Sequence, residues 1–177
     1  MHTTPSPLNL PPATLRRRLG AVLYDSLLLA GTLLAASALA LLVVVGFIGA
    51  EQVKLRNPLI GNPFFSTYLF FIGFFFYAWF WTHGGQTLGM RAWKIRIQQL
   101  NGNGITWWQA LLRFLLAGLW VLPIFYARKV LNLSLGSSLG IGFCFLLLIL
   151  ASRLHDRYSG TVLVVIKAQD QPVRSKA

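Results

Sequence analysis

Residues 16–25 read RRRLGAVLYD and open an apolar run that continues to residue 48. Three arginines precede this run, and an acidic residue lies just inside it. Seven positions separate Arg18 from Asp25, which is nearly two helical turns, so both side chains lie on one helix face about 10 Å apart along the axis. A carboxylate in or near hydrocarbon is costly and usually has a partner or a wet cavity. The stretch therefore predicts a membrane helix with an Arg/Asp pair at one end.

The composition excludes an ordinary soluble domain. The chain has 177 residues, of which 55% are apolar and only 11% are charged. Such a balance, with long uncharged runs, is typical of membrane spans. The net charge of +12 could suggest nucleic acid, but the basic residues lie at the ends of the apolar runs. This placement predicts a bilayer with anionic headgroups as the partner, and no nucleic acid.

Four apolar runs are candidate transmembrane helices, at residues 19–48, 64–82, 110–127 and 133–152. The first is longer than a signal-peptide core and contains Asp25, so we interpret it as an uncleaved signal-anchor. About 20 residues cross the hydrocarbon. If residues 27–48 form the lipid span, Asp25 lies at the cytoplasmic boundary. The fourth run carries Gly136 and Gly140 at the spacing of a helix-packing motif.

The longest polar connection predicts a small hairpin. Residues 92–98 alternate apolar and polar side chains, residues 101–104 (NGNG) form a turn signal, and residues 105–107 could return as a second strand. The alternative is an interfacial segment whose Trp and Ile side chains enter the headgroups. A further short strand is expected at residues 162–166.

The fold class expected is an all-α membrane protein with four transmembrane helices and a small cytoplasmic β-hairpin. Residues 1–14 contain four prolines and are expected to be a disordered tail, residues 15–167 to form the membrane domain, and residues 168–177 to be a disordered basic tail.

Positive charge predicts the orientation. Twelve of the sixteen Lys and Arg residues lie in the N-terminal segment, in the loop between the second and third spans with Arg113, and in the C-terminal tail. The other two loops hold the remaining four. Both termini are therefore expected in the cytoplasm of a bacterium, with the chain as a multi-pass protein of its inner membrane.

The chain resembles the RDD family of integral membrane proteins, named for an arginine and two aspartates. Arg18 and Asp25 match the first-helix pair, and Asp156 matches the second aspartate. Residues 84–94 (GGQTLGMRAWK) are similar to the family's Gly-x-Thr-x-Gly-Lys segment, with Met90 in place of the usual Lys.

Two further matches extend the resemblance over residues 15–167. Arg113 matches after a Gly-containing turn, and residues 155–161 (HDRYSGT) are similar to the family's His-Asp-Arg-x-x-Gly-Thr. The family has no established general activity, and transport, including cation–proton exchange, has been proposed for some members.

The candidate site is a polar network at the cytoplasmic ends of the first, third and fourth spans. Its expected members are Arg18, Asp25, Arg113, His155, Asp156 and Arg157. We expect Asp25 to pair with an arginine of this set. In the alternative interpretation, the two aspartates exchange a proton or cation and His155 titrates near neutrality.

Few residues could support catalysis. The chain has four acids, three histidines and one cysteine, and no Gly-x-Ser-x-Gly motif. No enzyme activity, metal or other cofactor is expected. The favoured function is a structural or accessory membrane module, and the alternative is a transporter or a transport-associated protein. Because four short spans enclose little volume, a transporting form would call for a homo-oligomer, and a partner membrane protein is the other expected contact.

Overall fold

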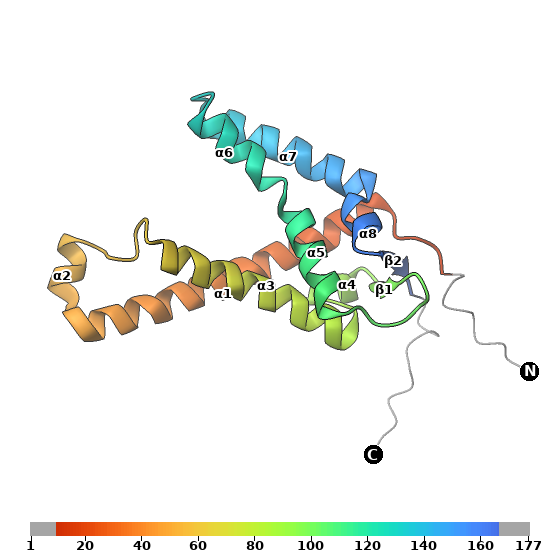
Figure 1. Ribbon diagram of the computed structural model, residues 1–177, viewed down its shortest axis with the longest axis horizontal. Coiled ribbons are helices and arrows are strands. Elements are labelled where there is room, and N and C mark those ends of the chain that lie inside the picture. Colours follow the sequence, from red (N-terminus) through yellow and green to blue (C-terminus); the bar gives the residue numbers. More distant parts are fainter. Residues whose placement is uncertain (1–9, 167–177) are drawn as a thin grey trace, which may run out of the picture.

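The computed structural model describes residues 10–166, and it is mostly helical (Figure 1). Its elements follow in the order α1 (Leu15–Ile48), α2 (Ala50–Leu55), α3 (Pro63–Gly84), α4 (Leu88–Ala92), β1 (Ile95–Gln99), α5 (Trp107–Gly118), α6 (Val121–Lys129), α7 (Leu135–Ser152), α8 (Leu154–Tyr158) and β2 (Thr161–Val165).

Four helical segments are long and apolar enough to cross a membrane, which confirms the predicted number of spans. They are α1, α3, the combined segment Trp107–Lys129, and α7. Large apolar side chains along them are exposed, with Leu34 72% and Phe64 84% accessible. A soluble protein rarely exposes this much contiguous apolar surface, so these faces fit a lipid environment.

The third span, predicted at residues 110–127, is confirmed as Trp107–Lys129, but it is not one continuous helix. It breaks at Leu119 and Trp120, between α5 and α6. Pro123 explains the position, because proline has no N–H and its ring clashes with the carbonyl four residues earlier, which belongs to Leu119. The Leu119 carbonyl instead accepts a bond from the N–H of Leu122 at 3.2 Å, in the tighter three-residue spacing.

The predicted hairpin is wrong in its pairing, although a two-stranded antiparallel sheet is present. β1 pairs with β2, with Ile97 opposite Leu163. The strand expected at residues 162–166 is thus the partner. Residues 105–107 instead lead into α5, because Thr106 and Gln109 form a reciprocal capping box. That Ser/Thr-x-x-Glu/Gln signal marks a helix start.

The folded domain begins earlier than expected. Pro12 forms a bridge with Val164, the Ala13 N–H donates to the Leu163 carbonyl at 2.9 Å, and Ala13 is buried. Residues 11–13 therefore extend the sheet edge, and the disordered tail predicted for residues 1–14 is wrong there. Residues 1–9 and the predicted tail at 168–177 lie outside the described residues.

The buried core lies at one end of the molecule, where α4, α8, β1 and β2 gather beside the start of α1 (Figure 1). Its members are Ala13, Ala21, Ala78, Trp81, Met90, Ile95, Ile97, Ile105, Ala110 and Leu163. From this end the α1–α3 pair and the α6–α7 pair diverge (Figure 1). The sheet and short helices thus hold together helices that separate farther along.

The glycine that brings α6 and α7 together is Gly142, whose missing Cβ leaves room for the side chain of Ile124. The predicted packing residues do not do this. Within the described residues, nothing lies within 4 Å of a Cβ built at Gly140, and only the Ser134 hydroxyl of its own helix cap approaches one at Gly136. That face is free of close contacts in the described chain, and its use by a partner stays a prediction.

Candidate functional site

The centre of the polar network is Asp156, held by two arginines from two other helices. Arg18 on α1 donates through Nη1 to Oδ2 at 2.7 Å, and Arg113 on α5 donates through Nη1 to Oδ1. All three side chains are at most 6% exposed. A carboxylate with an arginine on each oxygen fixes geometry as well as charge. We call these three residues the clasp, because they join α1, α5 and α8.

Neighbouring residues hold the clasp in place. Arg18 Nε also donates to the Ala13 carbonyl at 3.1 Å, so the N-terminal segment orients the guanidinium. Arg113 Nη1 also donates to Thr161 Oγ1 at 2.9 Å, where β2 begins. The Ser159 hydroxyl donates to the His155 carbonyl at 2.5 Å and lies 2.7 Å from Thr161 Oγ1. Hydrogen bonds within residues 155–161 (HDRYSGT) therefore hold the carboxylate of Asp156 in position.

A local backbone feature sets the direction of α8. Arg153 adopts a left-handed conformation with φ of 54°, which ends α7 and lets α8 start in a new direction. His155 and Asp156 then lie in the buried first turn, whereas Arg157 is exposed. The prediction that Arg157 belongs to the network is wrong, because α8 turns it outward.

Among residues 10–166, Asp25 does not pair with an arginine, so that prediction is also wrong there. Its Oδ2 accepts from the Thr87 hydroxyl at 2.5 Å, and its Oδ1 accepts from the Gly89 N–H at 2.9 Å. Thr87 also caps α4, accepting from the Met90 N–H at 3.1 Å. Asp25 is buried, with 3% of its surface exposed. A neutral hydroxyl and a backbone amide thus replace the expected cation.

Gly89 makes this contact sterically feasible. A Cβ at this position would lie 2.5 Å from the Ala21 carbonyl oxygen and 2.8 Å from Asp25 Cγ. Only glycine lets α4 approach α1 this closely. Sequence reasoning missed Thr87 and Gly89 as site residues. The available signal was the resemblance of residues 84–94 to the family's Gly-x-Thr-x-Gly-Lys segment, from which no site residue was predicted.

The two ionisable groups of α8 have displaced pKa values. Burial, reinforced by the charge of Arg113, lowers the pKa of His155 to about 4, so this imidazole is neutral near pH 7. Burial alone would raise the pKa of Asp156, but the charges of Arg113, His155 and Arg18 together outweigh it and hold the pKa below its usual value. The clasp is therefore ionised at neutral pH, and His155 beside it is not.

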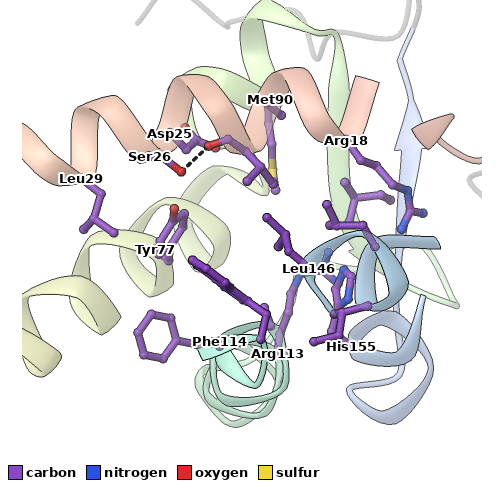
Figure 2. A pocket seen from close by; sticks show the side chains of 18 of the residues that line it. Arg18, Asp25, Ser26, Leu29, Tyr77, Met90, Arg113, Phe114, Leu146 and His155 are labelled. Atoms are coloured by element: carbon purple, nitrogen blue, oxygen red, sulfur yellow. Dashed lines mark hydrogen bonds between the residues drawn. The ribbon is translucent and has the colours of Figure 1, made fainter. Parts of the chain in front are cut away.

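A cavity of about 390 Å³ lies beside the clasp (Figure 2). Asp25, Tyr77, Arg113 and His155 surround the same space, together with apolar side chains such as Leu146. The cavity thus connects the two parts of the site, the clasp and the bonded Asp25. Among residues 10–166, no three His, Cys, Asp or Glu side chains come together that could hold a metal ion.

Four apolar spans closed by a buried arginine–aspartate clasp define a polytopic helical membrane protein. The RDD family model matches residues 12–160, and the chain belongs to this family of membrane proteins. No curated protein and no solved structure matches the chain. The matched range includes Arg18, Asp25 and Asp156, and also Thr87, Gly89 and Arg113.

Proposed function

We propose that this protein is a structural or accessory module of the membrane, with no catalytic activity of its own. The observation that carries this proposal is the clasp. Both oxygens of Asp156 are occupied by arginines from separate helices, and the group is buried. Protonation of this carboxylate would weaken both of its bonds to arginine and leave buried positive charge unpaired, which is costly. Asp156 is suited to hold helices together, not to exchange ions.

A second candidate function is transport of a cation, proton or small solute. Asp25 favours it, because this carboxylate lines the cavity and has no ion pair among the described residues. The break in the third span also borders the cavity at Trp120 and Val121. Interrupted helices line substrate sites in many transporters. Asp25, not Asp156, would then be the coupling group.

The orientation belongs to the same proposal. We infer a bacterial inner membrane with both termini in the cytoplasm, because twelve of the sixteen basic residues lie on the segments assigned there. The start of α1 and the sheet lie at one end of the molecule (Figure 1), which suits a shared cytoplasmic side facing anionic headgroups. A reporter fused after Ala177 tests it: a periplasmic signal would overturn the orientation.

Partners remain part of the proposal. A structural module needs a contact surface, and the uncovered Gly136 and Gly140 face of α7 is the one we assign to a homo-oligomer or another membrane protein. Crosslinking across Gly140→Cys, in the full chain, should trap a neighbour. Absence of any crosslink there, with efficient labelling of the same cysteine, would reject this face.

One variant separates the two functions. Asp25→Asn keeps an acceptor for Gly89 but removes the charge. We expect the cellular abundance or the detergent stability of this variant to fall. Neither the wild type nor the variant should carry an ion or solute flux in proteoliposomes. Normal abundance together with the loss of a measurable wild-type flux would instead establish transport. Glu51→Gln is the control, because Glu51 is exposed and forms an exposed ion pair with nearby Lys54.

A further inference from the structure

Three side chains that line the cavity each carry a buried polar nitrogen that the described chain leaves without a partner. Arg18 Nη2, Trp81 Nε1 and His155 Nδ1 are buried and have no hydrogen-bond partner among the described residues. All three residues line the cavity, and each is at most 5% exposed. Leaving such groups unsatisfied costs about 1–3 kcal/mol each. Three of them around one space indicate a missing ligand.

The chemistry of these nitrogens selects the ligand's polar end. A guanidinium nitrogen and an indole nitrogen can only donate hydrogen bonds, so they require an oxygen acceptor. Arg113 lies over the ring of Trp81, 5.6 Å from its centroid, which adds a second cation beside the same indole. At this end of the cavity Arg18 and Arg113 share the ionised Asp156, whereas Asp25, which lines the same cavity, is bonded to Thr87 and Gly89. The local excess of positive charge beside the two arginines favours a carboxylate or phosphate over a neutral carbonyl there.

The rest of the lining is mostly apolar, apart from Asp25, Ser26 and Tyr77. Its lining includes Leu29 on α1, Phe114 and Ala117 on α5, and Leu146 and Ile149 on α7. Leu29 and Phe114 are labelled on one side of the space in Figure 2, and Leu146 lies nearer His155. An inorganic anion would leave this part empty, whereas a hydrocarbon chain would fill it. A volume of about 390 Å³ is within the range of small-molecule sites.

We propose that this cavity binds an anionic amphiphile, with its oxygen head on Arg18 and Trp81 and its hydrocarbon chain against α5 and α7. Arg18 lies one turn inside the start of α1, near the depth where headgroups lie if that end faces the membrane surface. A fatty acid or the head and one chain of an anionic phospholipid share this chemistry. The inference goes beyond the structural role and does not require transport.

The test uses the full-length protein, delipidated in a neutral maltoside and examined by native mass spectrometry with four probes. These are palmitate, phosphatidylglycerol, phosphatidylcholine and inorganic phosphate. We expect one palmitate or one phosphatidylglycerol per chain, and at least tenfold weaker retention of phosphatidylcholine and phosphate. Preference for palmitate identifies a free fatty acid as the ligand, and preference for phosphatidylglycerol identifies a membrane lipid. Equal retention of phosphatidylcholine, or tight binding of phosphate alone, overturns the proposal.

Two variants locate the binding. Trp81→Phe keeps an aromatic ring beside Arg113 but replaces the indole, with its N–H, by a smaller phenyl group. It should weaken binding of the preferred probe about tenfold, the typical value of a hydrogen bond to a charged acceptor. Ala117→Phe fills the apolar part and should abolish binding. The matched controls are Trp79→Phe and Ala38→Phe, which change exposed positions on α3 and α1. Unchanged binding in both cavity variants, each still monodisperse, would show that the ligand sits elsewhere and reject the site.

Discussion

Arg18 and Asp156 are 138 residues apart in the sequence, and they form a buried ion pair of 2.7 Å between α1 and α8. Arg113 closes the same carboxylate from α5. Asp25 and Asp156 both lie near arginines in the sequence, but it is Asp156, far from Arg18 along the chain, that binds both Arg18 and Arg113. The near one, Asp25, takes a hydroxyl and an amide. The clasp is thus a tertiary interaction, which forms only when α1, α5 and α8 have folded together.

Removing the clasp carboxylate should be costly. Asp156→Asn leaves two buried arginines with one amide oxygen between them, and the free energy of unfolding should fall by about 3–5 kcal/mol, as is typical when one partner of a buried pair is lost. Thermal or denaturant unfolding in detergent measures the change. The surface variant Glu51→Gln should alter stability by less than about 0.5 kcal/mol. Equal stability of Asp156→Asn and the wild type would show that the clasp does not hold the helices.

Stability should fall on mild acidification because of His155. Its pKa is about 4 in the folded protein, against an ordinary value of 6.5. Between pH 6.5 and pH 4, His155 is protonated in the unfolded chain but neutral in the folded chain. Its contribution to the free energy of unfolding is therefore complete above pH 6.5 and is lost as the pH falls toward 4. The groups that face this imidazole are Arg113, Asp156 and Arg18. The loss should reach about 3 kcal/mol.

The contribution of His155 is tested by comparing stability at pH 7 and pH 4.5 in the wild type and in a histidine variant. The lowered pKa of Asp156 stabilises the protein above its ordinary value of 3.8, and that contribution is lost only at still lower pH. His155→Gln should flatten the difference in unfolding midpoint between the two pH values, while exposed His83→Gln should preserve it. A wild-type midpoint that does not move between pH 7 and 4.5 would contradict the neutral imidazole.

The contact between α4 and α1 should tolerate no side chain at Gly89. Gly89→Ala places a methyl group 2.5 Å from the Ala21 carbonyl oxygen, so either α4 moves away or the backbone shifts. We expect a loss of about 1–3 kcal/mol, the usual cost of overpacking. The matched change Gly140→Ala meets no atom within 4 Å in the described part of the chain, and it should be neutral or slightly stabilising for the isolated protein. Similar midpoints for the two variants would argue against close packing at Gly89.

The sequence predicts the parts of this fold whose signals are local. Composition and run length identify the four spans, and the alternation of apolar and polar residues identifies β1, while a short strand is also expected at residues 162–166. Which strands pair with each other is not determined by local signals. β1 is followed by a strong turn signal, yet its partner is β2, because the capping box at Thr106 commits the intervening residues to α5. Competing short-range signals decide such cases, and helix capping wins here.

The same limit applies to the site. Arg18, Arg113, His155 and Asp156 meet as the shared depth of the helix ends predicts. The partner of Asp25 could not be read from charge, because Thr87 and a backbone N–H are chemically ordinary in a sequence. Only the fold shows that Gly89 admits the close approach that makes them available. Similarly, the left-handed conformation of Arg153 sets the direction of α8 and so leaves Arg157 exposed. No pattern in the sequence predicted that conformation.

The Asp25 bonds should behave as one coupled unit with Thr87. Thr87→Val removes the hydroxyl that donates to Asp25 and caps the Met90 N–H, leaving a buried carboxylate oxygen and an amide unsatisfied. We expect a loss of about 2–3 kcal/mol. Asp25→Asn should cost less, because its amide oxygen still accepts from Gly89. Since both changes break the same bond, the double variant should cost less than their sum by about 1 kcal/mol or more.

Thr87→Ser provides the matched control for this cycle. It keeps the hydroxyl in place and loses only a buried methyl group, so its unfolding midpoint should stay close to that of the wild type. Strict additivity of the Asp25 and Thr87 changes, or a Thr87→Ser loss as large as that of Thr87→Val, would mean that packing rather than the hydroxyl–carboxylate bond ties α4 to α1. Non-additive losses would show that Asp25 interacts with Thr87 on the α4 side and not with the arginines. The charge of Asp25 could then change without breaking the ion pairs of the clasp.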